Sequence, residues 1–323
     1  MGRRCRAVRA RIRREVLLLC ISWGAVALFA ALSAGSAESV LKWFRIADTR
    51  PEPTPGAFGS FHFLWIFICA ISVILAILAA WRLPFSNSDR RKQTTVDRTV
   101  FAFGILFLML ELYKQFFFWF ILNGKRYDVS IFPFQFCSLP IYFCLLAPLL
   151  PSAAFRNGCY RFLALYGTVG GYLVIGFPNL PDVMVLCYHT MIWHTLMISL
   201  GAFLLVATNC GEKLWRDILP GTVLFLLFFW IAMLFNRVLI PLEASGGKLN
   251  LYYMSPRYPT TYFVIRTVRA KLGWGASAVC YQLLFIFVGA LPLWLLGRIF
   301  CFFRKKGENR SEMTDWKKVF WKK

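Results

Sequence analysis

The sequence predicts an all-α fold: a polytopic membrane helix bundle of about eight transmembrane helices, with both termini in the cytoplasm. Of its 323 residues, 59% are hydrophobic and only 16% are charged, a balance that soluble proteins of this length do not have. Several apolar runs reach the roughly 20 residues that a spanning helix needs. The basic residues behind the net charge of +22 gather at the chain ends and between these runs, which is typical of membrane proteins.

The predicted helices are apolar runs separated by polar or proline-containing connectors. They cover residues 16–34, 61–83, 99–122, 132–150, 158–177, 184–208, 218–240 and 274–303. The first run follows a start with seven arginines. We interpret it as a retained helix, although the small residues at 33–37 also allow a cleaved signal peptide.

The middle runs differ in their polar content. The second is uninterrupted, whereas the third carries Glu111 and Lys114. The fourth contains three prolines and opens on Gln135 and Cys137. Glycines in the fifth run permit close helix packing, and the sixth holds two histidines.

A long connector, residues 241–273, separates the seventh and eighth runs. Its second half is amphipathic, with three basic residues, and is expected to lie on the membrane surface. Pro292 predicts a kink in the eighth run. The side with both termini collects 25 Lys and Arg residues and the opposite side 10, so the positive-inside rule assigns both termini to the cytoplasm.

The charge and cysteine patterns limit the partners and cofactors that this protein is expected to bind. Basic residues beside spanning helices attract anionic lipid headgroups, so membrane lipids are the expected partners, and protein partners stay open. The basic stretches lack aromatic interleaving and any nucleic-acid motif, which argues against nucleic acid. The ten cysteines show no C-x-x-C pair and no zinc spacing, so neither a metal nor another cofactor is predicted.

In this topology the unusual polar residues fall in the outer half of the bilayer. They are Glu111, Lys114 and Gln115 of the third run, Gln135, Cys137 and Ser138 of the fourth, Asn179 and Asp182 of a turn, His189 and His194 of the sixth, and Asn236 and Arg237 of the seventh. Polar groups in hydrocarbon need partners. Their common depth therefore predicts one polar pocket.

The residue types in this pocket favour a cysteine nucleophile. A thiol needs a base or a cation to give up its proton, and either His194 or His189 suits that role near neutral pH. Cys137 is preferred for its polar neighbours, with Cys187 as its rival. The two histidines stand five residues apart and point in different directions, which disfavours a shared metal.

Several short stretches, taken in order, resemble the YwaF-type integral membrane proteins. They are Phe132–Ser138 (FPFQFCS), Gly176–Asn179 (GFPN), His194, Asn236 and Asn250–Met254 (NLYYM). The resemblance covers about residues 99–295. It implies a six-helix membrane core at 99–303, after a basic N-terminus with two added helices at 1–98 and before a basic cytoplasmic tail at 304–323.

The wider group includes a eukaryotic cysteine-dependent lipid acyltransferase and, more distantly, androgen-induced membrane hydrolases of fatty-acid esters. By this resemblance Cys137 is the acyl-accepting nucleophile and His194 is its base. The family's histidine two positions before the cysteine is Gln135 here, and His189 is an addition. The other expected supporting or substrate-binding residues are Glu111, Ser138, Asn179, Asn236, Arg237 and Asn250.

The predicted function is therefore that of a multi-pass cell-membrane protein, a lipid acyltransferase or lipid-ester hydrolase with a Cys-His pair. A transporter or lipid-handling protein using the same pocket is the alternative, because intramembrane charges commonly mark ion or substrate paths. A structural membrane protein is a third reading. In the transporter reading these charges are Glu111, Lys114 and Arg237. In a purely structural reading Glu111 and Lys114 form an ion pair that neutralises itself, and Asn236 and Arg237 reach toward the interface.

Overall fold

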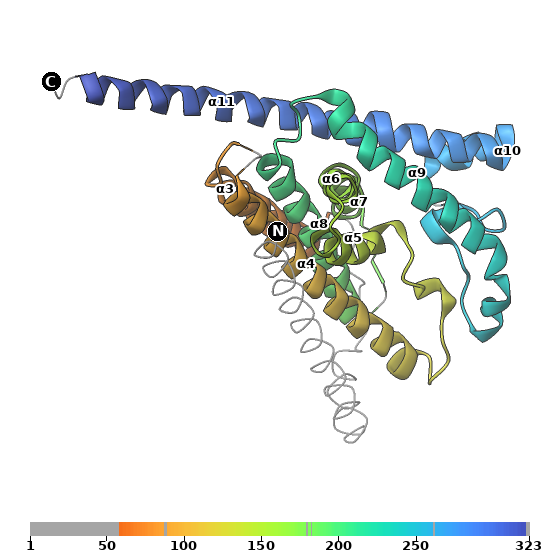
Figure 1. Ribbon diagram of the computed structural model, residues 1–323. Coiled ribbons are helices and arrows are strands. Elements are labelled where there is room, and N and C mark those ends of the chain that lie inside the picture. The colour runs from red at the N-terminus through yellow and green to blue at the C-terminus, as the bar shows by residue number, and fades with distance from the viewer. Residues whose placement is uncertain (1–57, 87–88, 179, 182, 261, 321–323) are drawn as a thin grey trace, which may run out of the picture.

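The computed structural model describes residues 58–86, 89–178, 180–181, 183–260 and 262–320, all helical or irregular with no strand among them (Figure 1). The helix predicted at 16–34 lies outside this range. The helices are α3 (Ser60–Trp81), α4 (Arg90–Phe116), α5 (Leu139–Leu149), α6 (Ala153–Phe162), α7 (Thr168–Gly176), α8 (Met184–Ala207), α9 (Leu214–Val238), α10 (Phe263–Leu283) and α11 (Leu291–Phe320). The π-helical turns Phe117–Leu122, Leu163–Gly167 and Leu284–Ala290 extend α4, join α6 to α7, and join α10 to α11.

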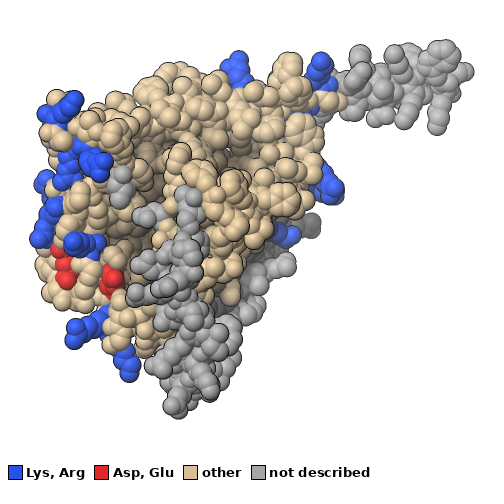
Figure 2. All heavy atoms as spheres, turned by 180° about the vertical axis from the view of Figure 1, so that it is seen from behind, with Lys and Arg blue, Asp and Glu red and all other residues tan. Residues whose placement is uncertain are grey.

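Five helical runs in the described part of the chain are long and apolar enough to cross a bilayer. They are Ser60–Trp81, Arg90–Leu122, Met184–Ala207, Leu214–Val238 and Phe263–Gly307. The apolar window of α8 is 72% buried, against 17% for α3, so α8 forms the centre and α3 the periphery. Figure 2 shows a broad surface without charged side chains in the middle of one face. The predicted polytopic membrane helix bundle is confirmed.

The run predicted as a spanning helix at 132–150 is shorter than expected. Residues 132–135 are not helical, Phe136–Ser138 form a 3-10 turn, and α5 has only 11 residues. At 1.5 Å per residue, such a helix spans about half of the hydrocarbon core. Pro133 precedes the turn and Pro140 occupies the first turn of α5, where its missing N–H costs nothing. The prolines thus define a break followed by a short helix.

Other boundaries also moved. α4 begins at Arg90, nine residues before the prediction, because the Asp89 carboxylate accepts hydrogen bonds from the N–H groups of Arg91 (2.7 Å) and Lys92 (3.1 Å). This N-cap satisfies donors that a helix start leaves free. The amphipathic half of the long connector is helical from Phe263, and Gly273 breaks that helix with φ +82, a conformation that favours glycine.

A buried charge cluster ties several helices together at one end of the bundle. Asp217 of α9 is fully buried and lies 2.9 Å from Arg161 of α6. Its other oxygen accepts the N–H groups of Gly211 (2.9 Å) and Lys213 (3.0 Å) and the indole N–H of Trp294 (3.3 Å). No pattern in the sequence predicts this ion pair between α6 and α9.

Removing this carboxylate should cost much of the protein's stability. In Asp217→Ala, Arg161 stays buried without its counter-charge, so the free energy of unfolding should fall by about 3–5 kcal/mol. Glu212→Ala is the matched control: its partner Arg216 is 47% exposed, and an exposed pair contributes about 0–1 kcal/mol. Thermal unfolding in detergent compares the two; equal losses would contradict the structural role given to Asp217.

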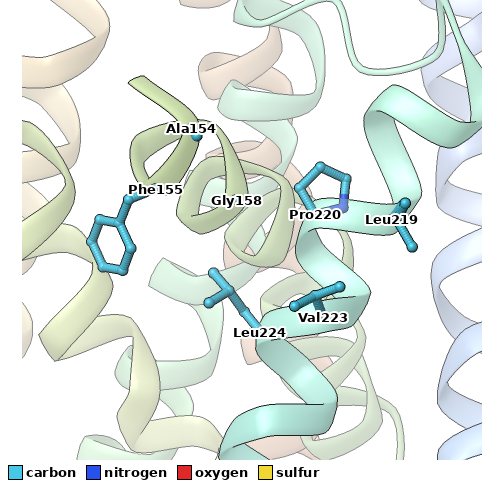
Figure 3. A pocket seen from close by; sticks show the side chains of 7 residues that line it. All are labelled: Ala154, Phe155, Gly158, Leu219, Pro220, Val223 and Leu224. Carbon is cyan, nitrogen blue, oxygen red and sulfur yellow. The ribbon is translucent and has the colours of Figure 1, made fainter. Parts of the chain in front are cut away.

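An open apolar groove of about 360 Å³ lies between α6 and α9 (Figure 3). Its lining contains no charged side chain and consists of Ala154, Phe155, Gly158, Leu219, Pro220, Val223 and Leu224. These residues neighbour the Arg161–Asp217 pair in sequence. The groove does not include any predicted site residue.

Candidate active site

Cys137 lies in the 3-10 turn that leads into α5, and its backbone is held from three sides. The Tyr142 hydroxyl donates to the Pro133 carbonyl (2.6 Å), and the Ser138 N–H donates to the Gln135 carbonyl (2.8 Å). The indole N–H of Trp193 donates to the carbonyl of Cys137 itself (3.0 Å). Cys137 is half-buried whereas Ser138 is buried, so the turn presents a thiol and conceals the hydroxyl.

Close helix contacts bring this turn to the central helix. A Cβ on Gly170 of α7 would collide with the Phe136 ring, and one on Gly171 with Ile198 of α8 and the carbonyl of His194. Only glycine permits this approach at both positions. α7 is thereby wedged between the Cys137 turn and the segment of α8 that carries His194.

A half-buried ion pair supplies the charge of this region. The Glu111 carboxylate accepts from the Lys114 ammonium (2.8 Å) and from the Gln115 amide (2.7 Å), which also donates to the Ile131 carbonyl (2.7 Å). The Lys114 ammonium lies 6.0 Å from the centre of the Trp193 ring, and Trp193 stacks on His189 and donates to the carbonyl of Cys137. Trp193 therefore connects this charge to the predicted nucleophile and to one of its predicted bases.

Both histidines of α8 are buried, and each has a defined tautomer. His194 Nδ1 lies 2.7 Å from the Thr190 carbonyl and His189 Nε2 lies 3.1 Å from the Leu110 carbonyl. Because a carbonyl only accepts, these nitrogens carry the protons. The remaining nitrogens, Nε2 of His194 and Nδ1 of His189, are left with lone pairs. A general base needs such a lone pair.

The connector after α9 folds back over this end and is fixed by two side-chain amides. Gln135 accepts the N–H of Tyr252 (2.8 Å) and donates to the carbonyl of Asn250 (3.2 Å). The Asn236 amide pairs with both backbone groups of Leu251, at 2.8 and 3.1 Å. Gln135, where the YwaF-type pattern has histidine, thus has a backbone-holding role.

A family model described as the TMEM164 family matches residues 57–296. The chain belongs to the TMEM164 family. No curated protein and no solved structure matches it. In this TMEM164-family protein the matched residues run from α3 into α11 and include every predicted site residue. The family match and the apolar helices together identify a multi-pass membrane protein. The YwaF-type relation stays a prediction.

The remaining predicted site residues of this TMEM164-family protein have different surroundings. Arg237 is exposed, with its guanidinium 5.9 Å from the Trp274 ring centre, as expected for an interfacial arginine. The Asn250 side chain accepts the N–H of Ser255 (2.9 Å) and so folds its own connector. Asn179 and Asp182 lie outside the described residues.

Two alternatives weaken in this arrangement. The Cys187 thiol is fully buried and donates to the Pro181 carbonyl (3.0 Å), so it is less available than Cys137. Within the described ranges, no three His, Cys, Asp or Glu residues group as a metal site would need, and no hydrogen bond joins Cys137 to His194. The two residues are related through Trp193, which donates to the carbonyl of Cys137 and precedes His194 in sequence.

Proposed function

We propose that this protein is a membrane-embedded lipid acyltransferase or lipid-ester hydrolase in which Cys137 is the nucleophile and His194 the base. One observation carries the proposal. Trp193 donates to the carbonyl of Cys137, whose half-buried thiol stands at the start of a short helix, and the Lys114 ammonium lies 6.0 Å from the centre of the Trp193 ring. The next residue in sequence is His194, whose Nδ1 bonds to the Thr190 carbonyl and leaves the lone pair on Nε2. A cation and a base are the two groups that activate a cysteine.

The reaction runs in two balanced halves. His194 Nε2 takes the thiol proton, and the Cys137 sulfur attacks the ester carbonyl carbon, whose π electrons move to oxygen. When these electrons return, the bond to the leaving alkoxide breaks and the imidazolium gives it the proton. In the second half His194 takes the proton of a second alcohol, or of water in a hydrolase, and the oxygen attacks the thioester carbonyl. The carbon–sulfur bond breaks, the acylated product leaves, and the imidazolium returns the proton to the Cys137 sulfur.

The chemistry of the surroundings favours a lipid ester as the acyl donor. The site lies among helices that the bilayer surrounds, and α3 and α4 carry mostly unburied apolar windows. A membrane lipid reaches such a site by lateral diffusion, whereas a polar, water-soluble thioester must leave water at a cost. A transporter is less well supported, because the Glu111–Lys114 pair neutralises two of the three charges on which that reading rests.

Turnover in nanodiscs tests the donor class. Purified protein is reconstituted with a phospholipid that bears a tagged acyl chain, and lysolipid and free or transferred acyl groups are measured by mass spectrometry. We expect lysolipid to form without added acyl-CoA. Acyl transfer only from acyl-CoA would contradict the lipid-donor assignment. Absence of turnover together with protein-dependent lipid flux would replace the enzyme with the transporter.

A further inference from the structure

Four tyrosines form a cluster beside the Cys137 turn. Tyr252, Tyr253 and Tyr262 come from the connector and Tyr281 from α10, and Tyr252 packs against Phe136, the residue before Cys137. Their rings form a continuous cluster: centroids are 5.9 Å apart for 253–262, 6.0 Å for 262–281 and 6.5 Å for 252–281. The phenol cluster therefore adjoins the turn that carries the nucleophile.

Tyr252 differs from a packing residue in one respect. It is 1% exposed, and its hydroxyl has no hydrogen-bond partner within the described part of the chain. A buried hydroxyl without a partner destabilises the folded protein, because it gives up its hydrogen bonds to water and gains none. Phenylalanine would fill the same space without that cost. The tyrosine is therefore unexplained by stability alone.

The Tyr252 side chain is also held firmly. Its ring packs edge-on against Phe136 (5.6 Å) and Phe229 (5.7 Å). Its backbone adopts φ +59, a left-handed conformation that non-glycine residues rarely occupy. Gln135 and Asn236 stabilise this conformation through the hydrogen bonds to Tyr252 and Leu251. Gln135 is two residues from Cys137. The segment Gln135–Cys137 therefore carries the thiol and also holds the backbone of Tyr252.

We propose that the Tyr252 hydroxyl is a catalytic hydrogen-bond donor to the carbonyl oxygen of the lipid ester that Cys137 attacks. The inference rests on the proposed function and adds an oxyanion-stabilising residue to it. As the sulfur–carbon bond forms, the π electrons collect on the carbonyl oxygen and the phenol O–H donates to it while keeping its proton. The contact strengthens with this charge and so lowers the barrier. His194 alone moves the proton to the leaving alkoxide.

The protonation state of the phenol suits a donor. Burial raises the pKa of Tyr252 well above its ordinary value, and the nearby Cys137 raises it further. A raised pKa keeps the O–H intact at and above neutral pH. The donor therefore stays present wherever the thiol can be activated.

Tyr252→Phe tests the inference in the nanodisc assay. Removal of one oxyanion donor should lower kcat about 10²–10³-fold, with KM changed little because the contact strengthens in the transition state. The melting temperature should stay equal or rise, since the variant loses an unpartnered buried hydroxyl. Tyr166→Phe is the matched control: its buried hydroxyl pairs with Thr222 at 2.6 Å, so it should lower stability and leave kcat unchanged.

The outcomes are separable. If wild-type protein turns over no lipid ester, the proposed function fails. If wild type is active and Tyr252→Phe keeps its kcat within a few-fold, the inference about Tyr252 is wrong and the proposed function stands. A loss of kcat that tracks an equal loss of folded protein would also overturn it, because Tyr252 would then be structural.

Discussion

Replacing Cys137 by alanine should reduce lipid-ester turnover on the order of 10⁶-fold, to the uncatalysed background, as removal of a covalent nucleophile does. The reason is chemical: without the sulfur no thioester forms, and neither Lys114 nor His194 can supply the missing bond. Folding should be little affected. Cys137 is half-buried, and its backbone carbonyl accepts a hydrogen bond from Trp193 (3.0 Å) that an alanine can also accept. Turnover and thermal unfolding are measured on the same nanodisc preparation.

Cys187→Ala is the control for this prediction. It removes a thiol that is buried on α8 and bonded to the Pro181 carbonyl, so it should keep turnover within a few-fold of wild type. A reversed result, with Cys187→Ala inactive and Cys137→Ala active, would transfer the nucleophile to the rival cysteine. If both variants kept the turnover of wild type, neither Cys137 nor Cys187 would be the nucleophile.

Replacing His194 by glutamine should lower kcat about 10²–10⁴-fold, the usual contribution of a general base. Glutamine approximates the size of imidazole and can still donate to the Thr190 carbonyl, but it cannot accept the thiol proton. Some activity should remain, because the thiol itself and the Trp193 hydrogen bond that holds the Cys137 backbone are kept. The single-turnover rate of thioester formation is the readout that isolates this step.

His189→Gln separates the two histidines. His189 donates to Leu110 and stacks on Trp193 with ring centroids 5.6 Å apart, so its loss should affect the position of Trp193 more than proton transfer. We expect a smaller fall in the rate than for His194→Gln. A larger fall would assign the base to His189, the residue that the YwaF-type pattern lacks.

The sequence predicted much of the bundle, because apolar length and polar depth are local properties. Helix direction alternates along the chain, and this placed Glu111, Gln135 and Asn236 at one depth. The structure joins Glu111 to Lys114 and links Gln135 and Asn236 through the connector. The prediction of a spanning helix at 132–150 is wrong, because the prolines in this run do more than interrupt a helix. They mark a non-helical lead and a short helix instead.

Tertiary partners account for what the sequence could not predict. The Arg161–Asp217 pair joins residues 56 positions apart in two helices, and a single chain holds no local signal for that pairing. Asp89 could have been found, since aspartate is one of the residue types that commonly cap a helix start. Tyr252 had no distinguishing mark among connector aromatics, because its role depends on burial without a partner.

Mapping of the acyl intermediate tests the central claim most directly. Wild-type protein is exposed to an alkyne-tagged phospholipid ester, quenched in acid, digested and analysed by mass spectrometry, with and without hydroxylamine. We predict a hydroxylamine-sensitive acyl group on the peptide that contains Cys137, absent in Cys137→Ala and strongly reduced in His194→Gln. An acyl group on another residue, or turnover with no covalent intermediate at Cys137 at any time point, would contradict the account.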